Sequence, residues 1–129
     1  GYVIFNDITA RDIQRREMRS GVFSFCKAID TFCPLGPWIV TADEIPDPSN
    51  LEVSLQVNGV EKQRSNTSKL IFDIPTMIAS LSEGLTLEAG DLILTGTPGG
   101  VGMALPEGRF GDTADLLRFL ETTANDQIG

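Results

Sequence analysis

The sequence predicts an α+β fold, with strands and helices mixed along a chain of 129 residues. Two observations carry this prediction. Residues 51–57 alternate strictly between apolar and polar side chains, which is the pattern of a half-buried strand. Asn58-Gly59 follows, the preferred two-residue turn of a β-hairpin, so residues 60–63 should pair back on that strand. A chain of this length holds one domain at most.

The N-terminal third predicts a strand followed by a helix. An apolar run at residues 2–5 indicates a buried strand. Residues 10–19 are expected to form a helix, with Thr9 as the N-cap and Gly21 as a C-terminal stop.

The C-terminal half predicts a second helix over residues 74–82, because Asp73 can cap its start and Gly84 can end it. Residues 92–94 indicate a buried strand that leads into a glycine-rich loop. Apolar residues at helical spacing over 112–124 predict a last helix.

Composition excludes several classes of protein. The net charge of −8 argues against nucleic acid or an anionic membrane as a partner, because both require a positive surface. No apolar run reaches the about 20 residues of a membrane helix, and no signal-peptide pattern is present. A cytoplasmic location is therefore expected. The chain begins with Gly1 rather than Met, so we expect it to be part of a longer protein.

The sequence contains no histidine, which excludes Ser-His-Asp and Cys-His catalysis within this chain. Any bound metal must rely on oxygen ligands, which favours Mg²⁺, Mn²⁺ or Ca²⁺. Cys26 and Cys33 are too few for a zinc site. We expect both to be reduced and buried, with a disulfide as the alternative.

Candidate functional groups gather after the first strand. Asp7 follows that strand directly, and Arg11, Gln14 and Lys27 come soon after it. Loops after strands commonly present functional groups. The alternative is that Asp7 and Thr9 only cap the helix.

The second candidate is the glycine-rich loop at residues 95–102, which follows the expected strand at 92–94. Its four glycines would let backbone N–H groups approach an anion closely. The loop lacks the Gly-Lys-Ser/Thr ending of a nucleotide-binding loop, and Leu105 occupies the third glycine position of a dinucleotide fingerprint. A plain tight turn is the alternative.

Several motifs, in their order along residues 1 to about 104, resemble the fumarylacetoacetate hydrolase family. They are residues 6–12, Lys27, residues 43–48, residues 57–59 and residues 90–98. The resemblance implies a mixed β-sheet barrel or roll with flanking helices, usually a homodimer, with Mg²⁺ or Mn²⁺ held by carboxylates. It also implies substrates that are 2-oxo or 1,3-dicarbonyl carboxylic acids.

The same resemblance assigns roles to five residues. Asp7 is similar to the metal-binding aspartate, and Lys27 to the catalytic lysine that binds substrate and stabilises an enolate. Arg11 and Gln14 resemble the substrate-binding pair on the helix, and Thr97 resembles the threonine that binds the substrate carboxylate. Hydrolysis, decarboxylation and isomerisation are all compatible with such a site.

The sequence departs from the family pattern in two places. The family places a Glu-x-Glu metal-binding pair and an acid–base lid before the motif of Asp7, and neither precedes it here. We therefore expect an N-terminally incomplete catalytic domain over residues 1–129, which alone lacks part of the metal site, with a divergent tail at 105–129. The alternative function is a non-catalytic fragment or assembly module that keeps the fold and dimer surface.

Overall fold

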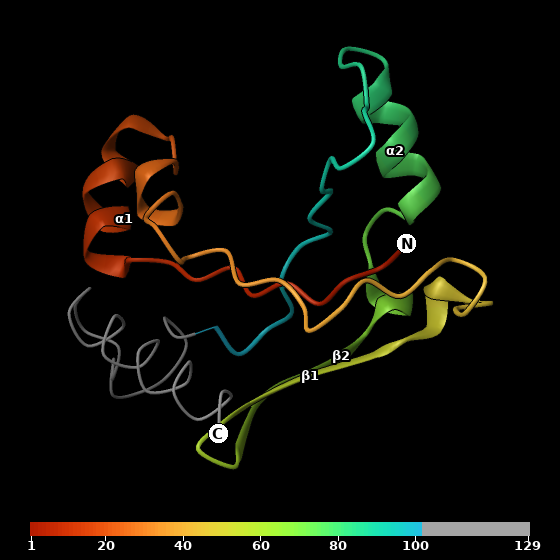
Figure 1. The fold of residues 1–129 in the computed structure, drawn as a ribbon. Coiled ribbons are helices and arrows are strands. Elements are labelled where there is room, and N and C mark those ends of the chain that lie inside the picture. Colours follow the sequence, from red (N-terminus) through yellow and green to blue (C-terminus); the bar gives the residue numbers. More distant parts are fainter. Residues whose placement is uncertain (102–129) are drawn as a thin grey trace. The chain divides into compact units, whose positions relative to one another are not determined.

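The computed structural model describes residues 1–101, and the predicted helix at 112–124 and the tail at 105–129 lie outside them. The described residues divide into two units (Figure 1). We call residues 3–39 the helical unit, and residues 1–2 with 40–101 the hairpin unit.

The helical unit is built around helix α1, Arg11–Glu17. A 3₁₀ turn, η1 (Met18–Ser20), continues it and ends at Gly21, whose φ of 73° is the left-handed conformation expected of a C-terminal stop. A second 3₁₀ turn, η2 (Phe25–Lys27), lies beside α1 (Figure 1). The predicted helix is thus confirmed, although its regular α-helical part is shorter than residues 10–19.

The core of the helical unit is small. Ile8, Ala10, Cys26 and Phe32 are buried. Ile13 and Ile29 pack against this cluster and are partly buried. The core therefore joins the loop before α1, the η2 turn and the segment after that turn. It thereby fixes the backbone position of Lys27, the last residue of η2.

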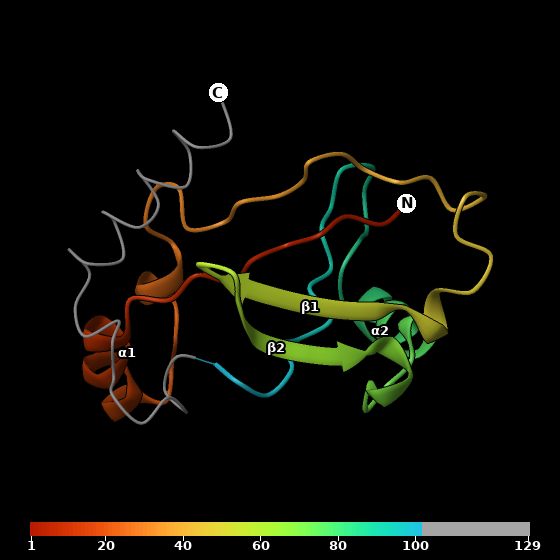
Figure 2. The same ribbon diagram turned by 90° about the horizontal axis from the view of Figure 1, so that it is seen from below.

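The hairpin unit contains strands β1 (Glu52–Val57) and β2 (Val60–Asn66), which pair antiparallel (Figure 2). Asn58 and Gly59 both have positive φ, as the type I′ turn requires, so the predicted hairpin is confirmed. The register shifts between Leu55 and its neighbour, which leaves a bulge at Lys62 on β2.

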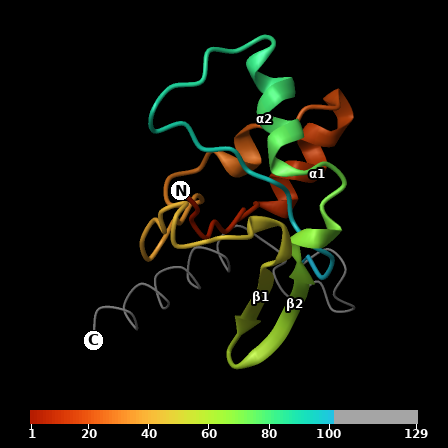
Figure 3. The same ribbon diagram turned by 90° about the vertical axis from the view of Figure 1, so that its right-hand side faces the viewer.

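Helix α2 spans Ile74–Ser82, the predicted range (Figure 3). At its start, the Asp73 carboxylate accepts a hydrogen bond from the Thr76 N–H. Two 3₁₀ turns, η3 (Pro48–Asn50) and η4 (Thr67–Lys69), flank the hairpin. None of the helices within residues 1–101 is long and apolar enough to cross a membrane.

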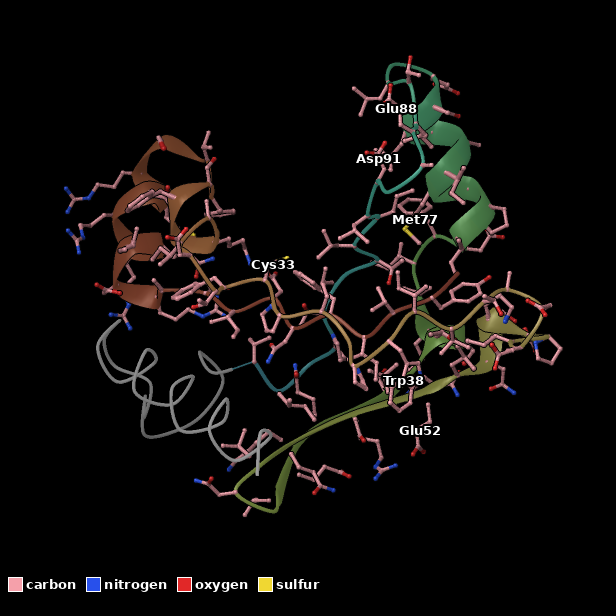
Figure 4. The ribbon with its side chains drawn as sticks, in the orientation of Figure 1. Cys33, Trp38, Glu52, Met77, Glu88 and Asp91 are labelled. Atoms are coloured by element: carbon pink, nitrogen blue, oxygen red, sulfur yellow. The ribbon has the colours of Figure 1, made fainter. Side chains whose placement is uncertain are left out.

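Two predicted strands are wrong. Residues 2–5 make only isolated bridges, from Tyr2 to Val40 and from Phe5 to Leu35, and Ile4 is 73% exposed. Residues 92–94 form no strand. They follow a turn between Glu88 and Asp91, both labelled in Figure 4, in which the Asp91 carboxylate accepts a hydrogen bond from the Glu88 N–H. Both apolar runs are too short to show the alternation of a strand, so they gave no evidence that a neighbouring strand was available for pairing.

The structure gives the two cysteines different environments. Both are free thiols, so no disulfide joins them. Cys26 is buried as expected, but the prediction that Cys33 is buried is wrong, because that residue is exposed on an extended segment (Figure 4).

Candidate active site

Asp7 and Lys27 form an ion pair in the helical unit, although twenty residues separate them in the sequence. The Lys27 Nζ lies 2.5 Å from the Asp7 Oδ2. About one third of each side chain is exposed, 34% for Lys27 and 33% for Asp7. The pair is therefore fixed by the fold and still open to a small molecule.

Thr9 is the third member of this group. Its hydroxyl accepts a hydrogen bond from the Lys27 Nζ at 3.0 Å and donates to the Asp7 carbonyl oxygen at 3.2 Å. Only 8% of Thr9 is exposed. The prediction that Thr9 caps the helix is wrong, because Ala10 is the N-cap of α1 and no side chain bonds there. The hydroxyl serves Lys27 instead.

Arg11 and Gln14 occupy the first turn of α1. The Arg11 Nη1 donates to the Gln14 Oε1 at 2.7 Å, a contact that i, i+3 spacing allows. A guanidinium fork suits a carboxylate, so this pair offers a second group for an acidic ligand. Asp7, Thr9, Arg11, Gln14 and Lys27 all belong to the helical unit.

Thr97 lies in the hairpin unit and is exposed. Its convergence with Asp7 and Lys27 stays a prediction. Within the hairpin unit the glycine-rich segment is anchored on β2, because the Gln63 Nε2 donates to the Pro98 carbonyl oxygen at 2.9 Å. Gly100 lies so close to the Lys62 carbonyl oxygen that a Cβ would not fit. These two contacts hold the glycine-rich segment against β2.

Sequence reasoning missed Glu17, the last residue of α1. Its carboxylate accepts from two consecutive backbone N–H groups, Phe25 to Oε1 at 2.8 Å and Cys26 to Oε2 at 3.0 Å. A hydrogen bond from the Cys26 side chain, supported by the backbone bonds, lowers the pKa of Glu17. Burial, and then the hydrogen bond and charge of Glu17, raise the pKa of the Cys26 thiol to about 11. No local sequence pattern marks such a contact across eight residues.

The metal-binding capacity of the described residues is limited. Within residues 1–101 no three histidine, cysteine or acidic side chains gather as a cation site would require. Asp7 is a hard oxygen ligand of the kind that Mg²⁺ and Mn²⁺ prefer, and it supplies one carboxylate.

The helical unit thus presents a partly exposed carboxylate–ammonium pair beside a buried hydroxyl. The chain belongs to the fumarylacetoacetate hydrolase family, since residues 1–124 match the domain described as "Fumarylacetoacetate (FAA) hydrolase C-terminal".

Three similar proteins illustrate the range of this family. Oxaloacetate tautomerase YisK of Bacillus subtilis is 46% identical over all of this chain and 43% of its own length. The crystal structure of 5-carboxymethyl-2-hydroxymuconate delta-isomerase from Mycobacterium smegmatis is 51% identical, with a TM-score of 0.70 over 78% of this chain and 38% of that one. Maleylpyruvate hydrolase from Sphingobium sp. SYK-6, in complex with manganese(II) and pyruvate, is 41% identical, with a TM-score of 0.60 over 76% and 42%. The chain thus spans less than half the length of each.

Proposed function

We propose that this chain carries the Asp7–Lys27 centre of an enzyme that acts on 2-oxo carboxylic acids. The observation that carries the proposal is the contact of the Lys27 ammonium with both Asp7 and Thr9. The names of the relatives support it, since oxaloacetate, maleylpyruvate and pyruvate are all 2-oxo acids. Fumarylacetoacetate, an acylpyruvate and 2-hydroxyhepta-2,4-diene-1,7-dioate are the candidate substrates.

Lys27 is the proposed catalytic residue. Removing a proton, carbon dioxide or an acyl group from the carbon next to the 2-oxo group leaves negative charge on the enolate oxygen. An ammonium aimed at that oxygen stabilises the charge as it develops. Asp7 and Thr9 fix the direction of the Lys27 side chain, so little reorganisation is needed when the substrate binds.

Arg11, Gln14 and Thr97 are the proposed substrate-binding residues. The Arg11 guanidinium is always charged and pairs well with a carboxylate, while Gln14 already holds it through its amide oxygen. Thr97 would bind the carboxylate at the other end of the substrate with its hydroxyl.

A divalent cation, Mg²⁺ or Mn²⁺, is the proposed cofactor. Within residues 1–101, Asp7 offers a hard carboxylate oxygen that suits such a cation, but no three acidic, histidine or cysteine side chains gather there as a full set of ligands. When bound, such a cation polarises the oxygen atoms of a 2-oxo acid as a Lewis acid. We infer that turnover requires further ligands beyond the described residues.

Membership of the family supports proposals for the remaining features of the whole protein. We propose a barrel or roll of mixed β-sheet with flanking helices, a single catalytic domain over residues 1–129 with a divergent tail at 105–129, and assembly as a homodimer. A cytoplasmic location and a place in the breakdown of aromatic compounds complete the proposal.

The test is a titration of the 129-residue chain with Mn²⁺, followed by paramagnetic broadening of its amide NMR signals. Broadening should begin at residues 7–10, and Asp7→Ala should abolish it there. Asp91→Ala, which removes an acid of the hairpin unit, is the matched control and should leave the pattern unchanged. Broadening that ignores Asp7→Ala would refute the metal role.

The alternative is a non-catalytic assembly module, and the absence of a cluster of acids within residues 1–101 favours it. The same titration separates the two functions. An assembly module has no reason to bind Mn²⁺ at Asp7, so its broadening pattern should not depend on Asp7→Ala.

A further inference from the structure

We propose that Glu17 is a positioning residue that holds Lys27 in contact with Asp7 and Thr9. The inference rests on the proposed function, because it concerns how the catalytic lysine is presented. Glu17 acts through the backbone of the η2 turn, Phe25–Lys27, and touches neither substrate nor metal in this scheme.

The contacts surround the peptide units just before Lys27. Glu17 receives the N–H groups of Phe25 and Cys26, one on each carboxylate oxygen. On the other side, the Cys26 carbonyl oxygen accepts from the Ala10 N–H at 2.9 Å. The Cys26 side chain is fully buried in the core. The turn is thus tied to the end of α1 and to the loop before it.

These hydrogen bonds and the burial of Cys26 determine the position of the Lys27 Cα atom. The Cys26 carbonyl oxygen accepts from Ala10, and the residue before Ala10, Thr9, carries the hydroxyl that Lys27 contacts. A flexible lysine side chain reaches a target reliably only when its Cα is fixed, since an unfixed one spreads over many rotamers. Glu17 therefore shares in setting the 2.5 Å contact between Lys27 and Asp7.

A carboxylate is needed for this role. Both oxygens accept, whereas a glutamine offers one acceptor and would turn its NH₂ group toward a backbone N–H. The charge also strengthens both bonds. The lowered pKa of Glu17 agrees with an ionised acceptor. Glu17→Gln should therefore release one end of the turn while keeping size and helix propensity.

The test uses acetylation of lysine by an N-hydroxysuccinimide ester, followed by peptide mass spectrometry. The chain has three lysines, Lys27, Lys62 and Lys69, so the two others serve as internal references. In Glu17→Gln the rate at Lys27 should rise by roughly threefold or more relative to the references, because a charged hydrogen bond to the turn is lost. Glu83→Gln, the same change at an exposed acid of the hairpin unit, should alter no rate.

Thermal unfolding is measured on the same samples to separate positioning from general stability. An unchanged rate at Lys27 in a folded Glu17→Gln variant would overturn the proposal. So would an equal rise at all three lysines, which would mean that Glu17 only stabilises the fold. If Glu17→Gln does not fold, Glu17→Asp, which keeps the charge but shortens the side chain, is tested against the same criteria.

A second arm ties the residue to substrate. Pyruvate affinity is measured by NMR titration for the unmodified chain, Glu17→Gln, Lys27→Met and the double variant. Glu17→Gln should weaken binding when Lys27 is present and have no further effect when it is absent, the non-additivity of residues that act through one another. Additive losses would overturn the proposal. If the unmodified chain does not bind pyruvate, the proposed function fails, while the acetylation rates still decide the role of Glu17.

Discussion

Replacing Gly100 by alanine should detach the glycine-rich segment from β2. Gly100 has a φ of 96°, which a residue with a side chain rarely adopts. Its added Cβ would also overlap the Lys62 carbonyl oxygen, a backbone atom at the β-bulge that has no flexible end to move aside.

The expected loss has two parts. The positive φ costs an L-residue about 1–2 kcal/mol. Relief of the overlap requires the segment to retreat by roughly 1 Å to reach a normal contact distance. The hydrogen bond from Gln63 to the Pro98 carbonyl oxygen, now 2.9 Å long, would then be too long to survive. Because a neutral hydrogen bond contributes about 1 kcal/mol net, the sum is about 2–3 kcal/mol.

Urea unfolding followed by circular dichroism measures this loss. With a slope of about 1–3 kcal/mol per M, the midpoint of Gly100→Ala should fall by roughly 1 M or more. Gly99→Ala is the matched control, since a Cβ on Gly99 meets nothing within 4 Å. It should leave the midpoint nearly unchanged. Equal midpoints for the two variants would refute the close packing of this segment on β2.

Three further predictions follow from the described residues. Phe32→Ala should cost about 3–5 kcal/mol, because it empties a buried site, whereas Phe72→Ala, at a residue 62% exposed, should cost much less in the same urea experiment. The folded chain should react with one equivalent of a thiol reagent near pH 8, at the exposed Cys33, and with two equivalents when unfolded, because burial raises the pKa of Cys26 to about 11; two rapid equivalents in the folded state would contradict this. Hydrogen bonds from Thr76 lower the pKa of Asp73 below its ordinary 3.8. The stabilisation of α2 by the Asp73 carboxylate should therefore be complete above pH 3.8, and it should be lost as the pH falls through the lower pKa of the folded state. Asp73→Asn should remove this part of the acid dependence, and an identical acid titration of both proteins would count against the cap.

Local sequence signals predicted the elements whose stabilising groups lie within a few residues of one another. The Asn58-Gly59 turn set the hairpin, and Asp73 with Pro75 set the start of α2. Residues 92–94 show the limit of such signals. Their apolar run indicated burial, yet Leu94 is 55% exposed and no strand forms among the described residues there. Burial depends on partners that a short run cannot name.

The candidate site was predicted in composition but not in its internal bonds. Residue types and their order pointed to Asp7 and Lys27, and the structure brings these two together. Thr9 was interpreted as a cap because that is what a threonine before a helix usually does. The actual partner of the Thr9 hydroxyl, Lys27, lies eighteen residues away. The partners of Glu17 are also distant in sequence, and they follow a turn that sequence patterns do not define.

The most direct measurement of the central claim is the affinity of the chain for pyruvate with Mn²⁺ present, compared between Lys27→Met and Lys69→Met. If the Lys27 ammonium binds the oxygen atoms of a 2-oxo acid, its removal costs a charged hydrogen bond of about 1.5–3 kcal/mol, or a rise of roughly tenfold or more in Kd. Lys69→Met, which removes an equal charge from the hairpin unit, should leave Kd unchanged. Equal affinities for the two variants would contradict the account.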